Sequence, residues 1–182
     1  SPARRGNLGK IQKNNMISLK GKTAIVTGAS RGIGAATVRK LSDLGANVFF
    51  TYKSSPDNAA ALSNETGATP VLCDQSDGVK IEKTIDEIFA QTGSIDILVN
   101  NAGITKDGFF MIMPCDDWNC VLETNLNGAF RWTKCVARKM YAQRRGAIIF
   151  VSSVSGLVGV AGQTNYAASK GALCAFSRAA AG

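Results

Sequence analysis

Histidine is absent from this sequence of 182 residues. Its absence excludes catalytic triads and dyads that depend on an imidazole, as well as metal sites with histidine ligands. Cysteine is present but scattered, with five residues and no C-x-x-C pair: Cys73, Cys115, Cys120, Cys135 and Cys174. This odd number fits neither a disulfide framework nor a four-thiolate zinc site. We therefore expect reduced thiols in the core or at an interface of an intracellular protein, without a bound metal.

Charge and long hydrophobic runs are both limited. With 45% hydrophobic and 19% charged residues, the chain can bury a substantial core, which excludes a disordered or coiled-coil protein. The longest uncharged stretch, Gly146 to Ser169, is long enough to cross a bilayer, but its serines, glycines and amides exclude a membrane helix. We expect a buried strand there that continues into a loop, and no membrane partner.

The net charge of +8 is concentrated at one end of the chain. Residues 1–15 carry Arg4, Arg5, Lys10 and Lys13 and no acid. The other charges are spread along the chain, a distribution that does not indicate nucleic-acid binding. The segment predicts a basic disordered tail or an expression leader, with a remnant of an organelle transit peptide as the alternative.

Short β-branched apolar runs alternate with segments of helical period after this tail. The predicted strands cover residues 23–27, 47–51, 70–73, 95–100 and 147–152. Their nearly continuous hydrophobicity is typical of parallel strands that are buried on both faces. An apolar stripe from Ile33 predicts the first helix, and a longer stripe predicts one helix from about Cys115 to Gln143. The alternation predicts an α/β fold with a doubly wound, Rossmann-like parallel sheet.

A glycine-rich turn joins the first predicted strand to the first predicted helix. Gly28, Gly32 and Gly34 stand in the spacing G-x-x-x-G-x-G. Glycines let the backbone approach a pyrophosphate, and the N-terminus of the following helix offers free N–H groups to anions. With a strand before it and a helix after it, the turn predicts a dinucleotide site rather than an ordinary tight turn.

The end of the second strand indicates which dinucleotide binds. An NAD site is expected to carry an acid here for the ribose 2′-hydroxyl, but this strand ends in Tyr52 and Lys53. Lys53 and Arg31 of the glycine turn offer two cations to a 2′-phosphate. We therefore expect NADP(H), and the alternative interpretation of the two cations is an ordinary solvated surface.

Four polar residues form a candidate catalytic set. Tyr166 and Lys170 are four positions apart, so a helix places both on one face. Because the chain lacks histidine, Tyr166 is the natural proton donor to a carbonyl oxygen, and a nearby ammonium lowers the pKa of a phenol toward neutrality. Ser153 follows the fifth strand and can hydrogen-bond the same carbonyl. Asn125, a poor helix former inside the long helix, indicates a distorted turn or a water site.

These motifs together resemble the short-chain dehydrogenase/reductase family from about residue 19 to 182. The wide glycine spacing, Asn100 to Gly103 after the fourth strand, and the candidate catalytic set carry the likeness. The match is closest to the beta-ketoacyl-acyl-carrier-protein reductase branch, in residues 26–34, 100–107, 123–125 and 162–170. The resemblance implies NADPH-dependent reduction of a 3-oxoacyl thioester, on acyl carrier protein or CoA, to the 3-hydroxyacyl thioester in fatty acid biosynthesis.

The resemblance also implies a role for individual residues. Asp74, directly after the third strand, is implied to hold the adenine ring, although a helix cap would use an isolated Asp equally well. Asn101 and Gly103 are implied to lie against the adenosine ribose. The implied cofactor-binding set is Gly28, Ser30, Arg31, Gly32, Ile33, Gly34, Tyr52, Lys53, Asp74, Asn101, Ala102, Gly103, Tyr166 and Lys170. The implied catalytic set is Asn125, Ser153, Tyr166 and Lys170.

The resemblance also implies the oligomeric state, the location and the domain bounds of the protein. It implies a cytoplasmic homotetramer built partly through the two long helices, with a plastid or another organelle as the alternative location, and one NADP-binding domain over residues 16–182. Other functions stay open: a reductase of acetoacetyl-CoA, small ketones or sugars, or a non-catalytic NADP-binding or assembly subunit. Because the family's sheet continues past the helix of Tyr166, we expect residues 1–182 to be part of a longer polypeptide. Without further strands, the fifth strand would be an open edge.

Overall fold

The computed structural model describes residues 17–181, and the tail predicted at residues 1–15 lies outside them. The described residues contain one parallel sheet with the strand order β3-β2-β1-β4-β5. The strands are β1 (Thr23–Val26), β2 (Asn47–Tyr52), β3 (Thr69–Leu72), β4 (Ile97–Asn100) and β5 (Ala147–Phe150). All five predicted strands are found, with ends that shift by one or two residues. The predicted Rossmann-like α/β fold is confirmed.

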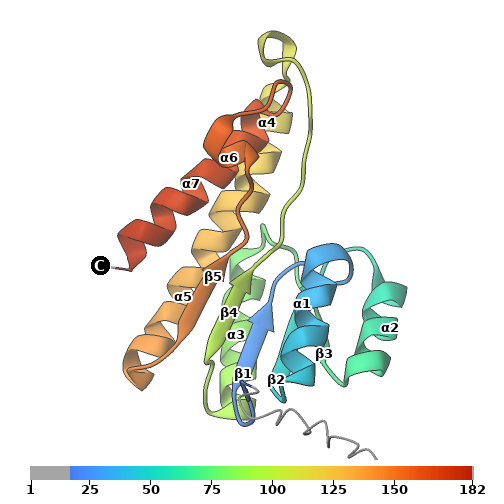
Figure 1. The fold of residues 1–182 in the computed structure, drawn as a ribbon, viewed down its shortest axis with the longest axis vertical. Coiled ribbons are helices and arrows are strands. Elements are labelled where there is room, and N and C mark those ends of the chain that lie inside the picture. The colour runs from blue at the N-terminus through green and yellow to red at the C-terminus, as the bar shows by residue number, and fades with distance from the viewer. Residues whose placement is uncertain (1–16, 182) are drawn as a thin grey trace, which may run out of the picture.

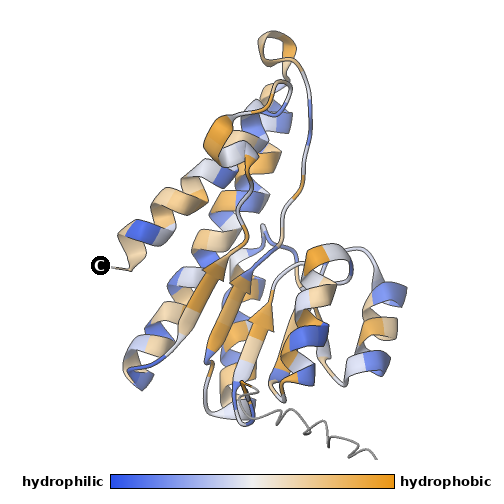
Figure 2. Cartoon of the chain, viewed as in Figure 1, coloured by the Kyte–Doolittle hydropathy of each residue, from blue (hydrophilic) through white to orange (hydrophobic). Residues whose placement is uncertain are grey.

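Helices connect the strands and cover both faces of the central sheet (Figure 1). They are α1 (Gly32–Asp43), α2 (Pro56–Thr66), α3 (Gly78–Thr92), α4 (Cys115–Leu122), α5 (Gly128–Gln143), α6 (Ser155–Val158) and α7 (Thr164–Ala180). Ala24 and Val26 of β1 pack with α1 and α2, whereas Ile25 packs with α3 and α5. Side chains of a strand alternate between the two faces, so each layer of helices buries every second residue. Figure 2 shows the central strands among the most hydrophobic parts of the chain.

The long helix predicted from Cys115 to Gln143 is interrupted. A π-helical segment, η2 (Glu123–Asn127), separates α4 from α5 without a break in the chain direction. Such segments are rare and frequently mark functional sites. The distorted turn that Asn125 predicted is therefore confirmed, and the expectation of one regular helix is corrected.

The two edge strands are less buried than the sequence predicted. β3 and β5 lie at the two edges of the sheet, and Leu72 and Ile149 are 57% and 49% exposed. An edge strand has a neighbour on one side only, so the helices that cover the centre leave part of it open. The stretch from Gly146 to Ser169 begins with a half-exposed strand that continues into a loop at residues 151–154, followed by the short helix α6 and the start of α7. The predicted order of strand and loop is confirmed, but the predicted burial of the strand is corrected.

One smaller prediction also needs correction. Ile33 does not join the buried stripe of α1, since it is 66% exposed in the first turn of that helix. Cys73 is buried and Cys115 is exposed at the start of α4, so the prediction of a core or interface position is confirmed for Cys73 and stays a prediction for Cys115.

Candidate functional site

The hydroxyl of Thr27 ties the glycine turn to the loop after β4. It accepts hydrogen bonds from the backbone N–H groups of Asn101 and Ala102, both at 3.1 Å. The Asn101 amide in turn donates to the carbonyl oxygens of Thr27 and Gly28, at 2.9 and 3.0 Å. Asn101 is therefore a brace between two loops at the carboxyl ends of β1 and β4, the edge where open α/β sheets bind ligands.

Two glycines of the turn are required by close backbone approaches. At Gly28, which has a φ of +62°, an added Cβ would lie 2.7 Å from the Cα of Ala102. At Gly34, an added Cβ would lie 2.7 Å from the Cα of Ala29. The first glycine lets the two loops touch, and the second packs α1 against the end of β1.

The N-terminus of α1 is open to an anion. Its N-cap residue, Arg31, has extended backbone and makes no side-chain capping hydrogen bond. The N–H groups of the first turn therefore need another partner, and the helix dipole favours a negative one. The guanidinium of Arg31 is exposed and forms no ion pair with any of residues 17–181. This end of the helix fits a pyrophosphate or phosphate group.

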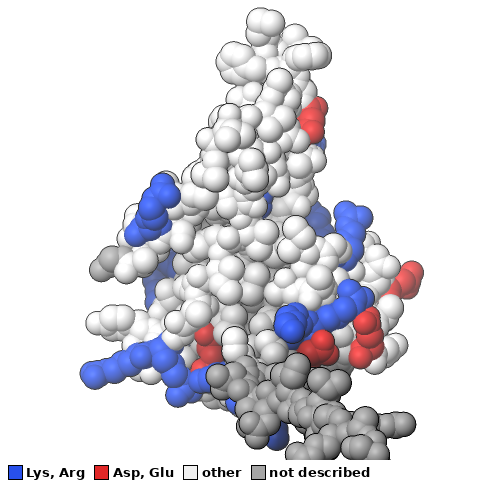
Figure 3. Space-filling view, in the orientation of Figure 1, with Lys and Arg blue, Asp and Glu red and all other residues white. Residues whose placement is uncertain are grey.

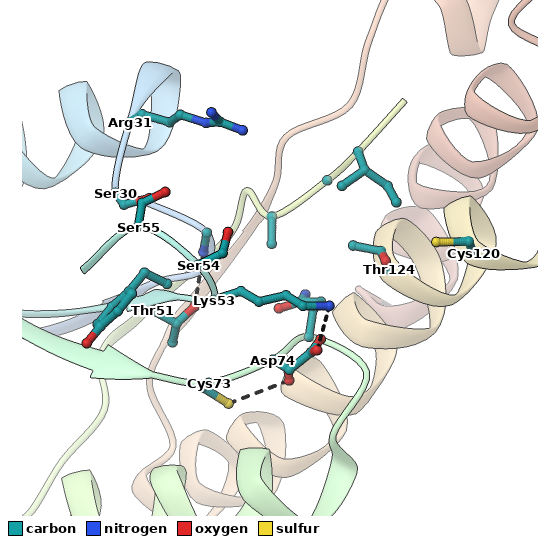
Figure 4. A pocket seen from close by; sticks show the side chains of 16 residues that line it. Ser30, Arg31, Thr51, Lys53, Ser54, Ser55, Cys73, Asp74, Cys120 and Thr124 are labelled. Atoms are coloured by element: carbon teal, nitrogen blue, oxygen red, sulfur yellow. Dashed lines mark hydrogen bonds and ion pairs between the residues drawn. The ribbon is translucent and has the colours of Figure 1, made fainter. Parts of the chain in front are cut away.

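A pocket of about 240 Å³ opens beside this helix end (Figure 4). Its walls come from the glycine turn, the ends of β2 and β3, the loop after β4 and the helix α4. Eight residues of the predicted cofactor-binding set line it: Gly28, Ser30, Arg31, Tyr52, Lys53, Asp74, Ala102 and Gly103. The fold thus brings together segments that are far apart in the sequence, as a dinucleotide site needs.

Lys53 and Asp74 form an ion pair on one wall of the pocket. The Lys53 ammonium lies 2.7 Å from Oδ2 of Asp74, and Oδ1 accepts hydrogen bonds from the backbone N–H and the hydroxyl of Ser76. Burial by itself raises the pKa of Asp74, but the bonds from Lys53 and Ser76 lower it below its ordinary value. Asp74 is not a helix cap, because Asp77 caps α3 through the N–H of Lys80.

Several pocket residues escaped the sequence analysis. They are Thr51, Ser54, Ser55, Cys73, Gln75, Ile104, Cys120 and Thr124. The hydroxyl of Thr51 accepts the N–H of Gly28 at 3.0 Å, and the side-chain oxygen of Gln75 accepts the indole N–H of Trp132 at 3.1 Å. Neighbours of predicted residues, such as Thr51 beside Tyr52, carried a positional signal. Cys120 of α4 and Thr124 of η2 carried none, because these elements meet the pocket only through the tertiary fold.

Asn125 joins three parts of the candidate catalytic region. Its side chain accepts the N–H of Ile104 at 2.8 Å and donates to the Ile104 carbonyl and the Ser169 hydroxyl, both at 3.0 Å. The residue is fully buried. Its amide thereby satisfies the backbone of the loop after β4 and fixes the π-helical segment against α7, which explains why the helix is distorted at this position.

Lys170 is buried on the face of α7 that it shares with Tyr166. Its ammonium donates to the Val151 carbonyl at 2.7 Å and lies 5.7 Å from the centre of the Tyr166 ring. Desolvation by burial lowers the pKa of Lys170. An added Cβ at Gly103 would lie 3.4 Å from this ammonium and 3.3 Å from Oδ1 of Asn125. The absence of a side chain at Gly103 thus leaves room for both groups.

Ser153 and Gly156 complete the region. The Ser153 hydroxyl oxygen accepts the N–H of Ser155 at 3.2 Å. At Gly156, an added Cβ would lie 2.5 Å from the backbone N of Gly171, so α6 rests directly on the backbone of α7 beside Lys170. Gly156 was missed by the sequence analysis, since a glycine between two helices leaves no signal until the helices are placed.

Not every predicted cofactor-binding residue faces the pocket. Gly32, Ile33, Gly34 and Asn101 lie behind or beside its wall, and Tyr166 and Lys170 lie outside its lining. Among residues 17–181, no group of three or more His, Cys, Asp and Glu side chains could bind a metal. None of the helices in this part of the chain combines the length and the apolarity that a membrane span needs.

The parallel sheet, its helical layers and the glycine turn at the carboxyl end of β1 define a Rossmann-like α/β protein. Residues 22–182 match the family described as short chain dehydrogenase. The chain therefore belongs to the short-chain dehydrogenase family, and the resemblance seen in its motifs is confirmed at this level. The chain is similar to several oxidoreductases.

Curated relatives and a solved structure agree with this membership. The 3-oxoacyl-(acyl-carrier-protein) reductase FabG of Escherichia coli (strain K12) is 44% identical, and that of Vibrio harveyi is 46% identical. Both alignments have 167 residues, which are 91% of this chain and 68% of the relative. The crystal structure of NAD+-bound xylitol dehydrogenase matches with a TM-score of 0.83 and 32% identity, over 89% of this chain and 64% of that one. The chain spans about two thirds of the length of these proteins.

Proposed function

We propose that this chain belongs to an NADPH-dependent oxidoreductase that reduces a 3-oxoacyl thioester on acyl carrier protein to the 3-hydroxyacyl thioester in fatty acid biosynthesis. The observation that carries the proposal is the placement of Tyr166 and the buried Lys170 on one face of α7, next to Asn125 and Gly103. Identity of 41 to 46% to reductases named for this substrate supports the thioester.

The described residues fit a nicotinamide dinucleotide. The uncapped N-terminus of α1 and the touching backbones at Gly28 support binding of the pyrophosphate. Asp74 and the loop from Asn101 to Gly103 would hold the adenosine, while Arg31 and Lys53 offer cations to a 2′-phosphate. The lack of an acid at the end of β2 supports NADPH over NADH.

In the proposed reaction, one side chain of this protein donates a proton to the substrate carbonyl and another donates a hydrogen bond to it. A bound reduced nicotinamide supplies the hydride that the carbonyl carbon accepts. Tyr166 then donates its phenolic proton to the carbonyl oxygen, and the ammonium form of Lys170 stabilises the phenolate that is left. The Ser153 hydroxyl, whose oxygen already accepts the N–H of Ser155, is free to donate to the same carbonyl oxygen.

A substrate comparison tests the proposal. We expect a higher kcat/KM for an acetoacetyl carrier-protein thioester than for acetoacetyl-CoA, small ketones or sugars, followed through oxidation of NADPH. The likeness to xylitol dehydrogenase makes a sugar or polyol the specific competing substrate. A preference for xylulose over both thioesters would reject the acyl substrate and keep the oxidoreductase.

Two tyrosine variants test the proton donor. Tyr166→Phe removes one hydroxyl, and we expect turnover to fall by about 10² to 10⁴, with NADPH affinity within a few-fold. Tyr141→Phe is the matched control, because Tyr141 lies on α5 with 87% exposure and should leave turnover unchanged. Normal turnover in Tyr166→Phe would assign the proton to another group. Absence of turnover in the unmodified protein, with intact NADPH binding, would favour a non-catalytic NADP-binding or assembly subunit.

Cofactor preference is tested by the two cations. Replacing Arg31 and Lys53 together by alanine should remove most of the preference for NADPH over NADH, since charge-assisted bonds to phosphate contribute about 1.5 to 3 kcal/mol each. Lys40→Ala, at the opposite end of α1, is the control. Equal kcat/KM for the two cofactors in the unmodified protein would contradict the assignment.

The proposal includes a homotetramer in the cytoplasm. Phe130 and Tyr141 on α5 are 48% and 87% exposed, and such apolar surface on a long helix supports self-association. Light scattering should give four times the mass of the chain, whereas a monomer at assay concentration would contradict this part of the proposal.

A further inference from the structure

The two cations proposed for a 2′-phosphate differ in their surroundings. Arg31 has no ionic partner among residues 17–181, whereas Lys53 is paired with Asp74 at 2.7 Å. Figure 4 shows the Lys53 side chain extended to Asp74, with Arg31 standing apart from this pair. The pocket therefore offers one cation without a counter-ion and one whose charge is already compensated.

We propose that Asp74 determines cofactor specificity by restraining Lys53, and that it lowers the preference of the pocket for a 2′-phosphate. The inference rests on the proposed function, because it assumes that the adenosine end of a nicotinamide dinucleotide occupies this pocket. A 2′-phosphate that approaches Lys53 has to compete with the carboxylate for the ammonium and is repelled by its charge. A 2′-hydroxyl meets neither obstacle.

Asp74 is the fixed member of the pair. Ser76 holds Oδ1 with its backbone N–H at 3.0 Å and its hydroxyl at 2.9 Å, which leaves Oδ2 for Lys53. The Asp74 side chain is 34% exposed, but that of Lys53 is 70% exposed at the end of a long flexible stem. Because the carboxylate is held and the ammonium can swing, Asp74 decides where the cation of Lys53 rests.

Neutralising Asp74 should therefore release Lys53 to the phosphate. The measured quantity is the ratio of affinities for adenosine 2′,5′-bisphosphate and adenosine 5′-monophosphate, from calorimetry on the purified protein at one fixed ionic strength. Both probes carry the same adenine, so any loss of an adenine contact cancels in the ratio. We expect Asp74→Asn to raise the ratio about tenfold, the scale of one charge-assisted hydrogen bond.

A double variant shows whether the effect passes through Lys53. In the Lys53→Met background, Asp74→Asn should change the ratio by no more than about twofold, because only weak through-space repulsion is left. Asp77→Asn is the matched control: it removes the same charge three residues away and keeps an equally good N-cap on α3. It should leave the ratio unchanged.

A second comparison does not depend on Asp74 variants. Since Arg31 is unrestrained and Lys53 is restrained, Arg31→Met should lower the ratio more than Lys53→Met. An equal or larger loss in Lys53→Met overturns the inference, as does an unchanged or lowered ratio in Asp74→Asn, or a rise of equal size with and without Lys53. If neither nucleotide binds the unmodified protein, both the proposed function and the inference fail. If the nucleotides bind but the ratio of their affinities does not change in Asp74→Asn, only the inference fails.

Discussion

The sheet is closed around β1 and β2 and open at its β5 edge. Around β1 and β2, Val26, Val38 and Phe50 are completely buried between the strands and α1. At the other side, Ile149 of β5 and Phe130 of α5 are about half exposed. Within residues 17–181, the first side completes its own core, whereas the second keeps apolar surface that these residues do not cover. Burial of apolar area is therefore distributed unevenly along one continuous sheet.

Charge is also distributed unevenly on the visible face. Figure 3 shows most Lys, Arg, Asp and Glu side chains on the lower part of the molecule, while the upper part is almost free of charge. Residues Phe109 to Ile112, and Leu157 and Val158 of α6, are exposed apolar residues, and α6 lies in this upper part (Figure 1). Nevertheless, Asn125 and Lys170 are buried and hydrogen-bonded. A precise polar network can thus be held by a few helices even where the surrounding surface is open.

The strongest test of this contrast replaces the same residue type in both halves. Phe50→Ala should lower the free energy of unfolding by about 3 to 5 kcal/mol, because it leaves a cavity in a sealed core. Phe109→Ala, at 74% exposure, should cost no more than about 1 kcal/mol. Urea unfolding of both variants measures the difference. Equal losses would break the comparison and show that another surface covers Phe109.

A pair of glycines tests the contact between the two halves. Gly28→Ala combines left-handed strain with a Cβ at 2.7 Å from Ala102, and we expect a loss of about 2 to 4 kcal/mol. Gly67→Ala has a similar φ of +71° but meets no atom within 4 Å, so it should lose only about 1 kcal/mol. Chemical denaturation measures both. Equal losses of stability in the two variants would show that the close approach of Gly28 to Ala102 does not stabilise the fold.

The smallest expected effect concerns Asp96, which joins the two halves at the amino ends of the strands. Its carboxylate accepts the N–H of Thr23 at 3.0 Å and contacts Lys22 and Arg145 at 3.3 and 3.1 Å. Burial alone raises the pKa of Asp96, but the hydrogen bonds from Thr23 and Lys22 lower it below its ordinary value. The resulting stability is present above the unfolded pKa of about 3.9 and is lost as the pH falls through the lower folded value.

We therefore expect the free energy of unfolding to fall more steeply below about pH 4 in the unmodified protein than in Asp96→Asn. Unfolding curves between neutral and acidic pH measure this difference. Asp57→Asn, an exposed acid in the first turn of α2, is the control and should leave the acid limb of the profile unchanged. Parallel profiles for the unmodified protein and Asp96→Asn would contradict the role of the buried carboxylate.

Much of the sheet and of its helices could be predicted from the sequence, because their signals are local. The glycine turn, the β-branched runs and the stripe of Ile81, Ile85 and Ile88 each specify an element within a few residues. The prediction of burial was wrong where burial depends on the neighbouring strands. Leu72 and Ile149 are as apolar as the residues of the central strands, yet they lie on edge strands and are about half exposed. Strand order is a property of the whole chain and has no local signal.

The sequence by itself determined the family, the parallel α/β fold and the residue types that its site uses, since spacing along the chain encodes turns, strands and helix faces. Only the tertiary structure decided that Lys53 meets Asp74, that Asn125 holds Ile104 and Ser169, and that α4 lines the pocket. These contacts join residues from separate elements. Their distances depend on how helices pack on the sheet, so no local pattern in the chain could have specified them.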